Sequence, residues 1–98
     1  MKNFFKKRGI DVPELKAQDD VENPLAYAHF IAGEWHWYVT EAGEIDGDLL
    51  LFGLVDGKDK EIGYFTLMQL ASVGAGLDED FEPVGIFDIY EDFDLRRK

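Results

Sequence analysis

Three stretches rich in apolar and aromatic residues follow one another in the middle of the chain, joined only by short turn signals. In residues 35–41 a period of two places both tryptophans on one face of a strand and the histidine between them on the other. Residues 48–55 are apolar on both faces, which is typical of a central strand covered on both sides. An Asp-Gly turn leads into residues 61–65 as an antiparallel neighbour. The sequence therefore predicts three strands in meander order.

Shorter signals predict the elements that precede these strands. A short helix is expected over residues 11–18, because Asp11 can cap it, a proline suits its first turn and Glu14 completes a capping box. The polar residues 19–24 end in Asn-Pro and are expected to form a loop. Residues 25–32 are predicted to be extended, which adds a further strand to the sheet.

The remaining connections and elements follow from glycine, capping and acidic patterns. Residues 42–47 are acidic and bracketed by glycines, so they are expected to form the turn between the first two strands of the meander. Thr66 and Gln69 have the spacing of a capping box, and the helix that they open should end at Gly74. After a flexible glycine-containing stretch and an acidic run, residues 84–90 are predicted to form a last strand.

These elements together predict an α+β fold, an antiparallel meander sheet of about four or five strands with one or two short helices on one face. The chain has 98 residues, of which 46% are hydrophobic, so it can build one core and is expected to form a single domain over residues 1–98. Seven of the ten basic residues lie near the two ends of the chain. Residues 1–10 and 95–98 are accordingly predicted to be mobile basic ends.

The distribution of charge is the main functional signal. The formal net charge is −11, but between Gly9 and Leu95 only three basic residues stand against all 21 acidic ones, a local balance of −18. Direct binding to nucleic acid is disfavoured, and attraction to a basic protein is favoured. An acidic surface can also serve solubility alone, or belong to a salt-adapted protein.

The expected location is the cytoplasm. The basic start of the chain is not followed by an apolar segment or a small-residue cleavage site, so a secretory signal is not predicted. The longest apolar stretch is far shorter than the roughly 20 residues that span a bilayer, so no membrane association is expected. The absence of cysteine excludes disulfides and thiolate zinc sites, and fits a cytosolic protein.

Few residues could carry catalysis. The only serine, Ser72, lies in a predicted helix outside any nucleophile-elbow motif, and Thr66 is needed as a cap. His29 and His36 lie on neighbouring predicted strands and could join an acid in a zinc site, but a packed strand histidine is the favoured interpretation of His36. No phosphate-binding loop or calcium loop is present. The chain is therefore predicted not to be an enzyme and to need no cofactor.

Several blocks of sequence resemble a small bacterial family that is known only as a domain of unknown function. The resemblance covers roughly Asn23 to Pro83, and its most specific blocks are Trp-x-Trp-Tyr-Val-Thr and Phe-Gly-Leu-Val-x-Gly. Members are often encoded on plasmids, integrative elements and phages, and the family has no accepted catalytic residues. The acidic, aromatic residues 87–94 depart from its pattern. The resemblance implies a mobile-element setting, where small acidic proteins are sometimes inhibitors of host defence.

Two functional hypotheses follow. The first is a non-enzymatic inhibitor, of the anti-CRISPR or anti-restriction type, whose acidic face occupies a basic, nucleic-acid-binding groove on another protein. The second is an accessory or scaffold domain that binds through its aromatic surface or a sheet edge, as a monomer or a homodimer. The candidate partner-binding residues are the acids Glu41, Glu44, Asp46, Asp48, Asp78, Glu79, Asp80, Glu82, Asp88, Glu91, Asp92 and Asp94.

Overall fold

The computed structural model describes residues 3–90 of the chain. Its helices and strands are η1 (Lys6–Arg8, a 3-10 helix), β1 (Leu25–Ala26), β2 (Ala28–Ala32), β3 (Trp35–Ile45), β4 (Asp48–Asp56), β5 (Lys60–Thr66), α1 (Leu67–Ser72), β6 (Gly76–Leu77), β7 (Val84–Gly85) and α2 (Ile86–Ile89). Among these residues, neither α-helix has the length and apolar composition needed to cross a membrane.

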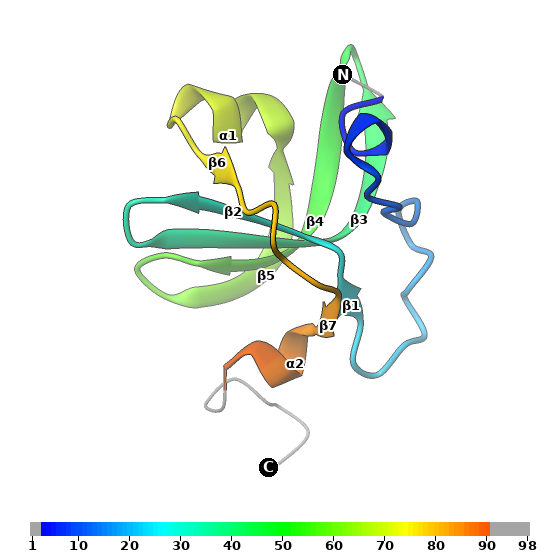
Figure 1. Ribbon diagram of the computed structural model, residues 1–98. Helices are drawn as coiled ribbons and strands as arrows, with labels where there is room; N and C mark the ends of the chain where they lie inside the picture. The colour runs from blue at the N-terminus through cyan, green and yellow to red at the C-terminus, as the bar shows by residue number, and fades with distance from the viewer. Residues whose placement is uncertain (1–2, 91–98) are drawn as a thin grey trace.

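The main sheet has five strands in the order β5-β4-β3-β2-β6, and a second sheet pairs β1 with β7 (Figure 1). All of these pairs are antiparallel, and β2, β3 and β4 each pair with the next strand in the chain. β4 lies inside the sheet, as its apolar sequence predicts. The predicted α+β fold with an antiparallel meander is therefore confirmed.

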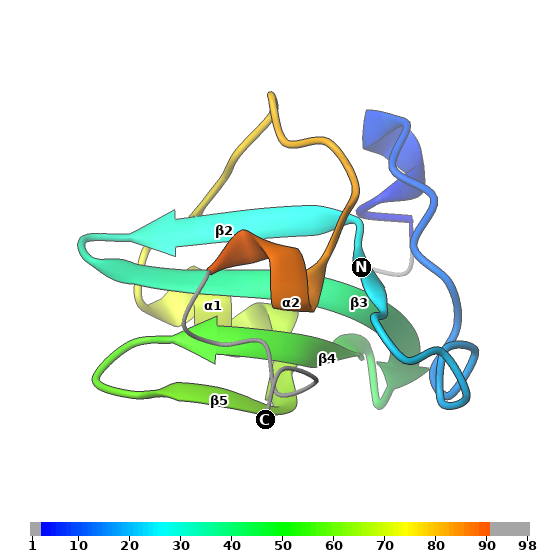
Figure 2. The same ribbon diagram turned by 90° about the horizontal axis from the view of Figure 1, so that it is seen from below.

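The sheet separates two hydrophobic cores. α1 covers one face, while α2 and the small sheet lie against the other (Figures 1 and 2). The buried residues on the α1 face are Phe5, Ala28, Phe30, Val39, Leu49, Leu51, Phe65, Leu67 and Leu70. Those on the α2 face are Ala26, Tyr38, Leu54 and Ile86. The helices thus lie on both faces, not on one face as predicted.

The turn between β3 and β4 is much tighter than the predicted turn over residues 42–47. β3 continues to Ile45, and the chain reverses at Asp46 and Gly47, whose φ angles are 44° and 81°. Two positive φ angles in sequence are what a two-residue hairpin needs, and Asp-Gly supplies them at little cost. The residues before the turn therefore remain paired with β4.

A β-bulge divides β3. The register with β4 shifts between Val39 and Glu41, and the hydroxyl of Thr40 donates a hydrogen bond of 2.9 Å to the carbonyl of Phe52. Gly53 lies opposite, where a β-carbon would collide with the carbonyl oxygen of Tyr38. The bulge therefore depends on the absence of a side chain at position 53.

The capping box predicted for α1 is confirmed. The backbone N–H of Gln69 donates to Oγ1 of Thr66 at 3.1 Å, and the N–H of Thr66 donates to Oε1 of Gln69 at 2.8 Å. Gly74 follows the helix with a φ of 69°, the left-handed conformation that glycine adopts without steric cost. The capping residues are only three positions apart, so the local sequence suffices to specify this helix.

The helix predicted over residues 11–18 is wrong. Glu14 forms an isolated bridge to β3, and Lys16 has a φ of 73°, which no α-helix accommodates. The N–H groups of Lys16 and Gln18 donate to the two carboxylate oxygens of Glu41, at 2.7 and 2.8 Å. Donors that a helix would use internally are therefore bound to a carboxylate on the sheet.

Residues near the N-terminal end of the chain pack against the core on the α1 face. Phe5 is only 6% exposed, and its ring packs edge-on against Phe30 with 6.2 Å between the ring centroids. Phe4 and Ile10 pack against the same core. Phe4, Phe5 and Ile10 thus contact the core, while the mobility predicted for residues 1–10 stays a prediction. The second predicted mobile end, residues 95–98, lies outside the described residues.

The strand predicted over residues 84–90 is mostly wrong. Only Val84 and Gly85 pair with β1, and the chain then turns into the short helix α2. The side chain of Asn23 accepts a hydrogen bond of 2.9 Å from the N–H of Phe87. This contact satisfies a donor in the first turn of α2 from a distant segment, so the helix can form where the sequence pattern indicates a strand.

Candidate functional site

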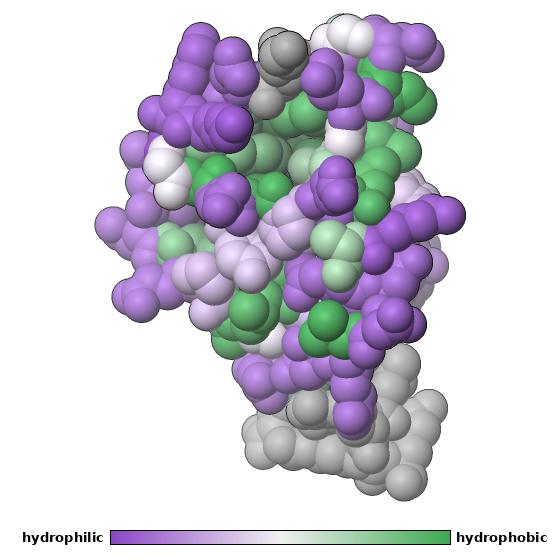
Figure 3. All heavy atoms as spheres, turned by 90° about the vertical axis from the view of Figure 1, so that its right-hand side faces the viewer, coloured by the Kyte–Doolittle hydropathy of each residue, from purple (hydrophilic) through white to green (hydrophobic). Residues whose placement is uncertain are grey.

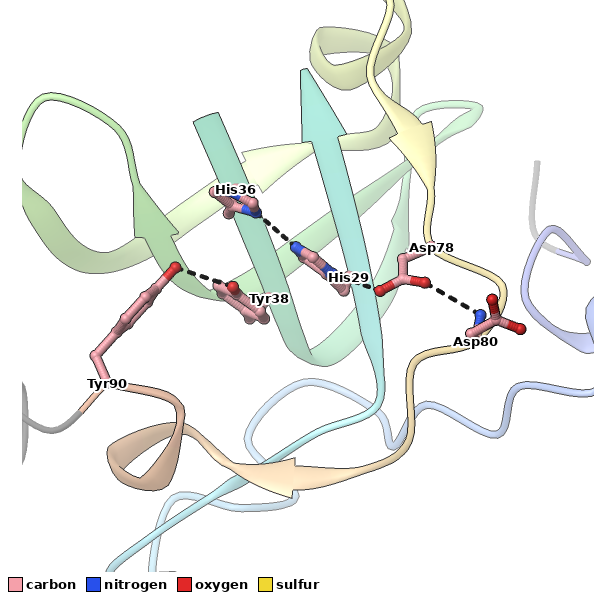
Figure 4. A network of polar contacts seen from close by, with 6 residues as sticks. All are labelled: His29, His36, Tyr38, Asp78, Asp80 and Tyr90. Carbon is pink, nitrogen blue, oxygen red and sulfur yellow. Dashed lines mark hydrogen bonds and ion pairs between the residues drawn. The ribbon is translucent and has the colours of Figure 1, made fainter. Parts of the chain in front are cut away.

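Asp78, His29 and His36 form a row of hydrogen-bonded side chains on the α2 face of the sheet (Figure 4). Nδ1 of His29 lies 2.9 Å from a carboxylate oxygen of Asp78, and its Nε2 lies 2.8 Å from Nδ1 of His36. His29 is on β2 and His36 on β3, two positions apart in register, so they are diagonal neighbours on one face. The backbone N–H of Asp80 donates to the other oxygen of Asp78 at 3.1 Å.

The geometry determines how protons are arranged along this chain. The hydrogen bond from His29 is the main cause that lowers the pKa of Asp78, so this carboxylate is ionised and accepts from Nδ1–H of His29. When both rings are neutral, Nε2 of His29 must accept from Nδ1–H of His36.

Two tyrosines extend the network toward α2. The ring of Tyr38 stacks on His29 with 4.4 Å between centroids and 4° between planes, and its hydroxyl lies 2.9 Å from that of Tyr90. Burial is the main cause that raises the pKa of both hydroxyls, and a hydrogen bond to Asp56 raises that of Tyr90 further. Both phenols therefore remain neutral and act as hydrogen-bonding groups.

This network has no nucleophile beside it among the described residues. The hydroxyl of Ser72 donates to the carbonyl of Gln69 in α1, on the opposite face of the sheet, and Thr40 and Thr66 have the structural bonds described above. The hypothesis that the chain is not an enzyme stays a prediction. What the network does is join β6, β2, β3 and the end of α2.

The structure brings His29 and His36 together, but not as a pair of metal ligands. Their nitrogens point at each other in a hydrogen bond, whereas two ligands of one ion direct their lone pairs at a common point. Within residues 3–90, no three histidine or carboxylate side chains are placed to hold a metal ion. The sequence indicated that the two rings could approach, but the link to Asp78 was missed.

Four of the predicted partner-binding acids have structural contacts. Glu41 is only 4% exposed and binds the turn at Lys16, which corrects its expected place on the surface. Asp48 accepts from the N–H of Met68 at 3.2 Å, which ties α1 to the sheet. The other two are Asp78, bound to His29, and Asp88, which accepts from the side-chain amide of Asn23 at 2.9 Å.

The other described acids are exposed and form two groups. Glu44 and Asp46 lie at the β3–β4 hairpin, while Glu79, Asp80 and Glu82 lie in the loop after β6. The loop begins at Asp78, whose N–H binds His29, the residue opposite Tyr38 on β3. Tyr38 precedes Glu44 by six residues, which is about 20 Å along a strand. The structure therefore does not bring these acids into one patch. Glu91, Asp92 and Asp94 lie outside the described residues.

The face formed by the N-terminal segment shows no continuous apolar area (Figure 3). Hydrophilic residues cover most of it and separate the apolar residues into small areas. A hollow of about 280 Å³ opens there between η1 and the β3–β4 hairpin, and Lys6, Asp11 and Glu44 are among its lining residues. Charges of both signs line this hollow, so it does not resemble a site for one kind of ion.

Sequence reasoning missed that Gln18 and Glu41 together fix the turn before β1. Gln18 is buried and donates from its side-chain amide to the carbonyls of Leu25 and Thr40, both at 2.9 Å. Together with Glu41 it closes the turn that borders a hollow of about 290 Å³ next to β5. An isolated acid within an apolar strand was the only sequence signal for this arrangement.

Comparisons of the chain with models of protein families, with curated proteins and with solved structures gave no match. The family resemblance carried by the two tryptophan- and glycine-containing blocks therefore stays a prediction. The functional conclusion must rest on the geometry of the molecule itself.

Proposed function

We propose that this protein is a small acidic interaction protein that binds a basic protein partner. The proposal rests on the exposure of most of the described acids named as partner-binding candidates. Glu44, Asp46, Glu79, Asp80 and Glu82 are exposed, whereas Asp78 is paired with His29 inside the molecule. Between Gly9 and Leu95 the acids outnumber the basic residues by 18, and such an excess produces a negative potential that attracts a basic surface and repels nucleic acid.

The placement of the acids bears on the kind of partner. Duplex DNA carries one charge per about 1.7 Å along its axis, so a mimic needs a continuous row of acids along one side. Two groups separated by about 20 Å, with other acids used internally, fit separate contacts on a basic protein better than such a row. An anti-CRISPR or anti-restriction role follows from the family resemblance alone and remains a hypothesis.

The alternative, an accessory domain that binds through aromatic groups or a sheet edge, is favoured by one observation. Tyr64 and Ile62 lie on one face of the edge strand β5 and are 59% and 40% exposed, so together they offer an apolar contact surface. The acidic surface and the edge strand belong to the same molecule, so the two hypotheses are compatible.

The test is affinity purification from the native host, with the full chain as bait, in low salt followed by stepwise elution with salt. We expect a basic protein that is released as the salt concentration rises, because salt screens attraction between exposed charges. If that protein normally binds nucleic acid, added DNA or RNA should compete for it. A partner that is itself acidic, or one that stays bound at about 1 M salt, would contradict the proposal.

A further inference from the structure

The edge strand β5 is long, regular and open on its outer side. It pairs with β4 through seven consecutive residues, from Lys60 to Thr66, without a bulge (Figure 2). Within residues 3–90 no strand pairs with its other side, and the opposite edge of the sheet, β6, has only two residues. Proteins usually protect such edges with proline, bulges or outward lysines. β5 has no proline, and its one lysine, Lys60, has Nζ 4.9 Å from the ring of Tyr90.

The direction of the backbone groups of β5 follows from the capping box. The N–H of Thr66 donates to Gln69, so it does not point toward β4. In an antiparallel ladder the N–H and C=O of one residue point to the same side, and the next residue points to the other. The N–H and C=O groups of Tyr64 and Ile62 are therefore directed to the open side of the sheet.

Two apolar side chains on the α2 face of β5, those of Ile62 and Tyr64, lie close to a hollow. The ring of Tyr64 packs on that of Phe52, with 4.8 Å between centroids. Ile62 borders the hollow of about 290 Å³, whose other apolar walls include Val21 and Phe87. An extended chain beside β5 would thus place every second side chain over an apolar surface.

Acids outnumber basic residues around this apolar strip. Asp19 and Glu22 are exposed and line the same hollow as Ile62, and Asp59 and Glu61 are exposed beside Lys58 and Lys60 at the start of the edge strand. A strand that binds here would meet apolar groups on one side and a net negative charge around them. Charge complementarity therefore selects lysine or arginine in the remaining positions of the bound strand.

We propose that β5 binds an extended basic segment of a partner protein, which adds to the main sheet as a sixth strand. Apolar side chains of that segment lie over Ile62 and Tyr64, and its basic side chains reach Asp19, Glu22 or Glu61. This inference rests on the proposed function and specifies its surface and its partner. A second copy of this chain is disfavoured as the occupant, because each copy carries a net charge of −11.

The probe is an eight-residue peptide that alternates lysine and valine, compared with an isomer that has four lysines followed by four valines. Both have the same charge and composition, but only the first can place valine on one face of a strand and lysine on the other. Affinity is measured by NMR titration of the full chain in low salt. We expect the alternating peptide to bind at least about tenfold more tightly than its isomer.

Two variants of one residue separate backbone pairing from side-chain contact. Ile62→Pro removes an outward N–H, and an edge strand tolerates proline where that group faces solvent. Ile62→Thr retains the N–H and a β-branched side chain. With circular dichroism confirming the fold, we expect Ile62→Pro to weaken binding of the alternating peptide at least about tenfold, and Ile62→Thr to change it less than about threefold.

Amide hydrogen exchange of the wild-type chain gives a second measurement that does not depend on any variant folding. We expect the alternating peptide to slow exchange at Ile62 and Tyr64. Equal binding of both peptides, with no effect of Ile62→Pro and no slowing at these amides, would overturn the edge proposal but leave the basic-partner function standing. If neither lysine peptide binds even in low salt, both proposals fail.

Discussion

Replacement of Glu41 by glutamine should strongly destabilise the fold. Its carboxylate accepts backbone hydrogen bonds from Lys16 and Gln18 at 2.7 and 2.8 Å, and the side chain is nearly inaccessible to water. Glutamine has one acceptor oxygen, so one of these bonds is lost and an amide N–H₂ faces a backbone N–H. Hydrogen bonds to a charged group contribute about 1.5–3 kcal/mol, and an unpaired buried donor costs about 1–3 kcal/mol. We therefore expect a loss of about 2–4 kcal/mol.

The assay is thermal unfolding followed by circular dichroism at neutral pH. For a domain of this size each kcal/mol shifts Tm by about 4–8 °C, so Glu41→Gln should melt roughly 8–32 °C below the wild type. Glu44→Gln on the same strand is the matched control, because Glu44 is exposed and should change stability by less than about 0.5 kcal/mol. A Glu41→Gln protein that melts within about 2 °C of wild type would refute the role given to this carboxylate.

Three further predictions follow from the packing and from the histidine chain. Gly53→Ala should cost several kcal/mol in urea unfolding, because its β-carbon would meet the carbonyl of Tyr38, whereas Gly63→Ala, with open space around the site, should be nearly neutral; equal effects would contradict the close approach. Phe5→Ala should lower the free energy of unfolding by about 3 kcal/mol, and an unchanged value would show that the N-terminal end is not anchored. Because the folded-state pKa of Asp78 lies below its ordinary 3.8, its carboxylate stabilises the fold above that pH and loses this contribution as pH falls through the lowered pKa. The stability difference between wild type and Asp78→Asn, measured by urea unfolding, should therefore be constant near neutral pH and shrink only below about pH 4; a difference that shrinks near pH 6 would contradict this assignment.

The parts of the fold that could be predicted are those set by neighbouring residues. Alternation, short Asp-Gly turns and the Thr66–Gln69 capping box act over a few positions, and the structure shows the strands, the meander and α1 where they were expected. Even the misplaced turn between β3 and β4 contains the Asp46-Gly47 pair that makes the reversal. Local chemistry predicted these elements because the local patterns agree with the long-range strand pairing.

The parts that could not be predicted depend on contacts between distant residues. The helical capping pattern near Asp11 fails because Glu41, 25 positions after Lys16, binds its backbone donors. Most of the predicted last strand is instead α2, where the N–H of Phe87 donates a hydrogen bond to the side chain of Asn23, 64 positions earlier in the chain. A pattern in one segment cannot indicate which distant side chain will satisfy its backbone.

The candidate site shows the same division. The approach of His29 and His36 follows from their places on adjacent strands, but the bond to Asp78 joins residues 49 positions apart. Composition draws attention to the acids, yet it could not separate Glu41, which is buried, from Glu44, which is exposed three residues later. Which acids are available to a partner depends on the fold.

The central claim is that the exposed acids attract a basic partner. The most direct measurement is the Kd for the partner recovered from the host, determined by calorimetry at about 0.05 M and about 0.5 M salt. We expect the affinity of the protein for this partner to fall at least about tenfold between the two salt concentrations, because the added ions screen the exposed charges. An affinity that is the same at both salt concentrations would contradict it.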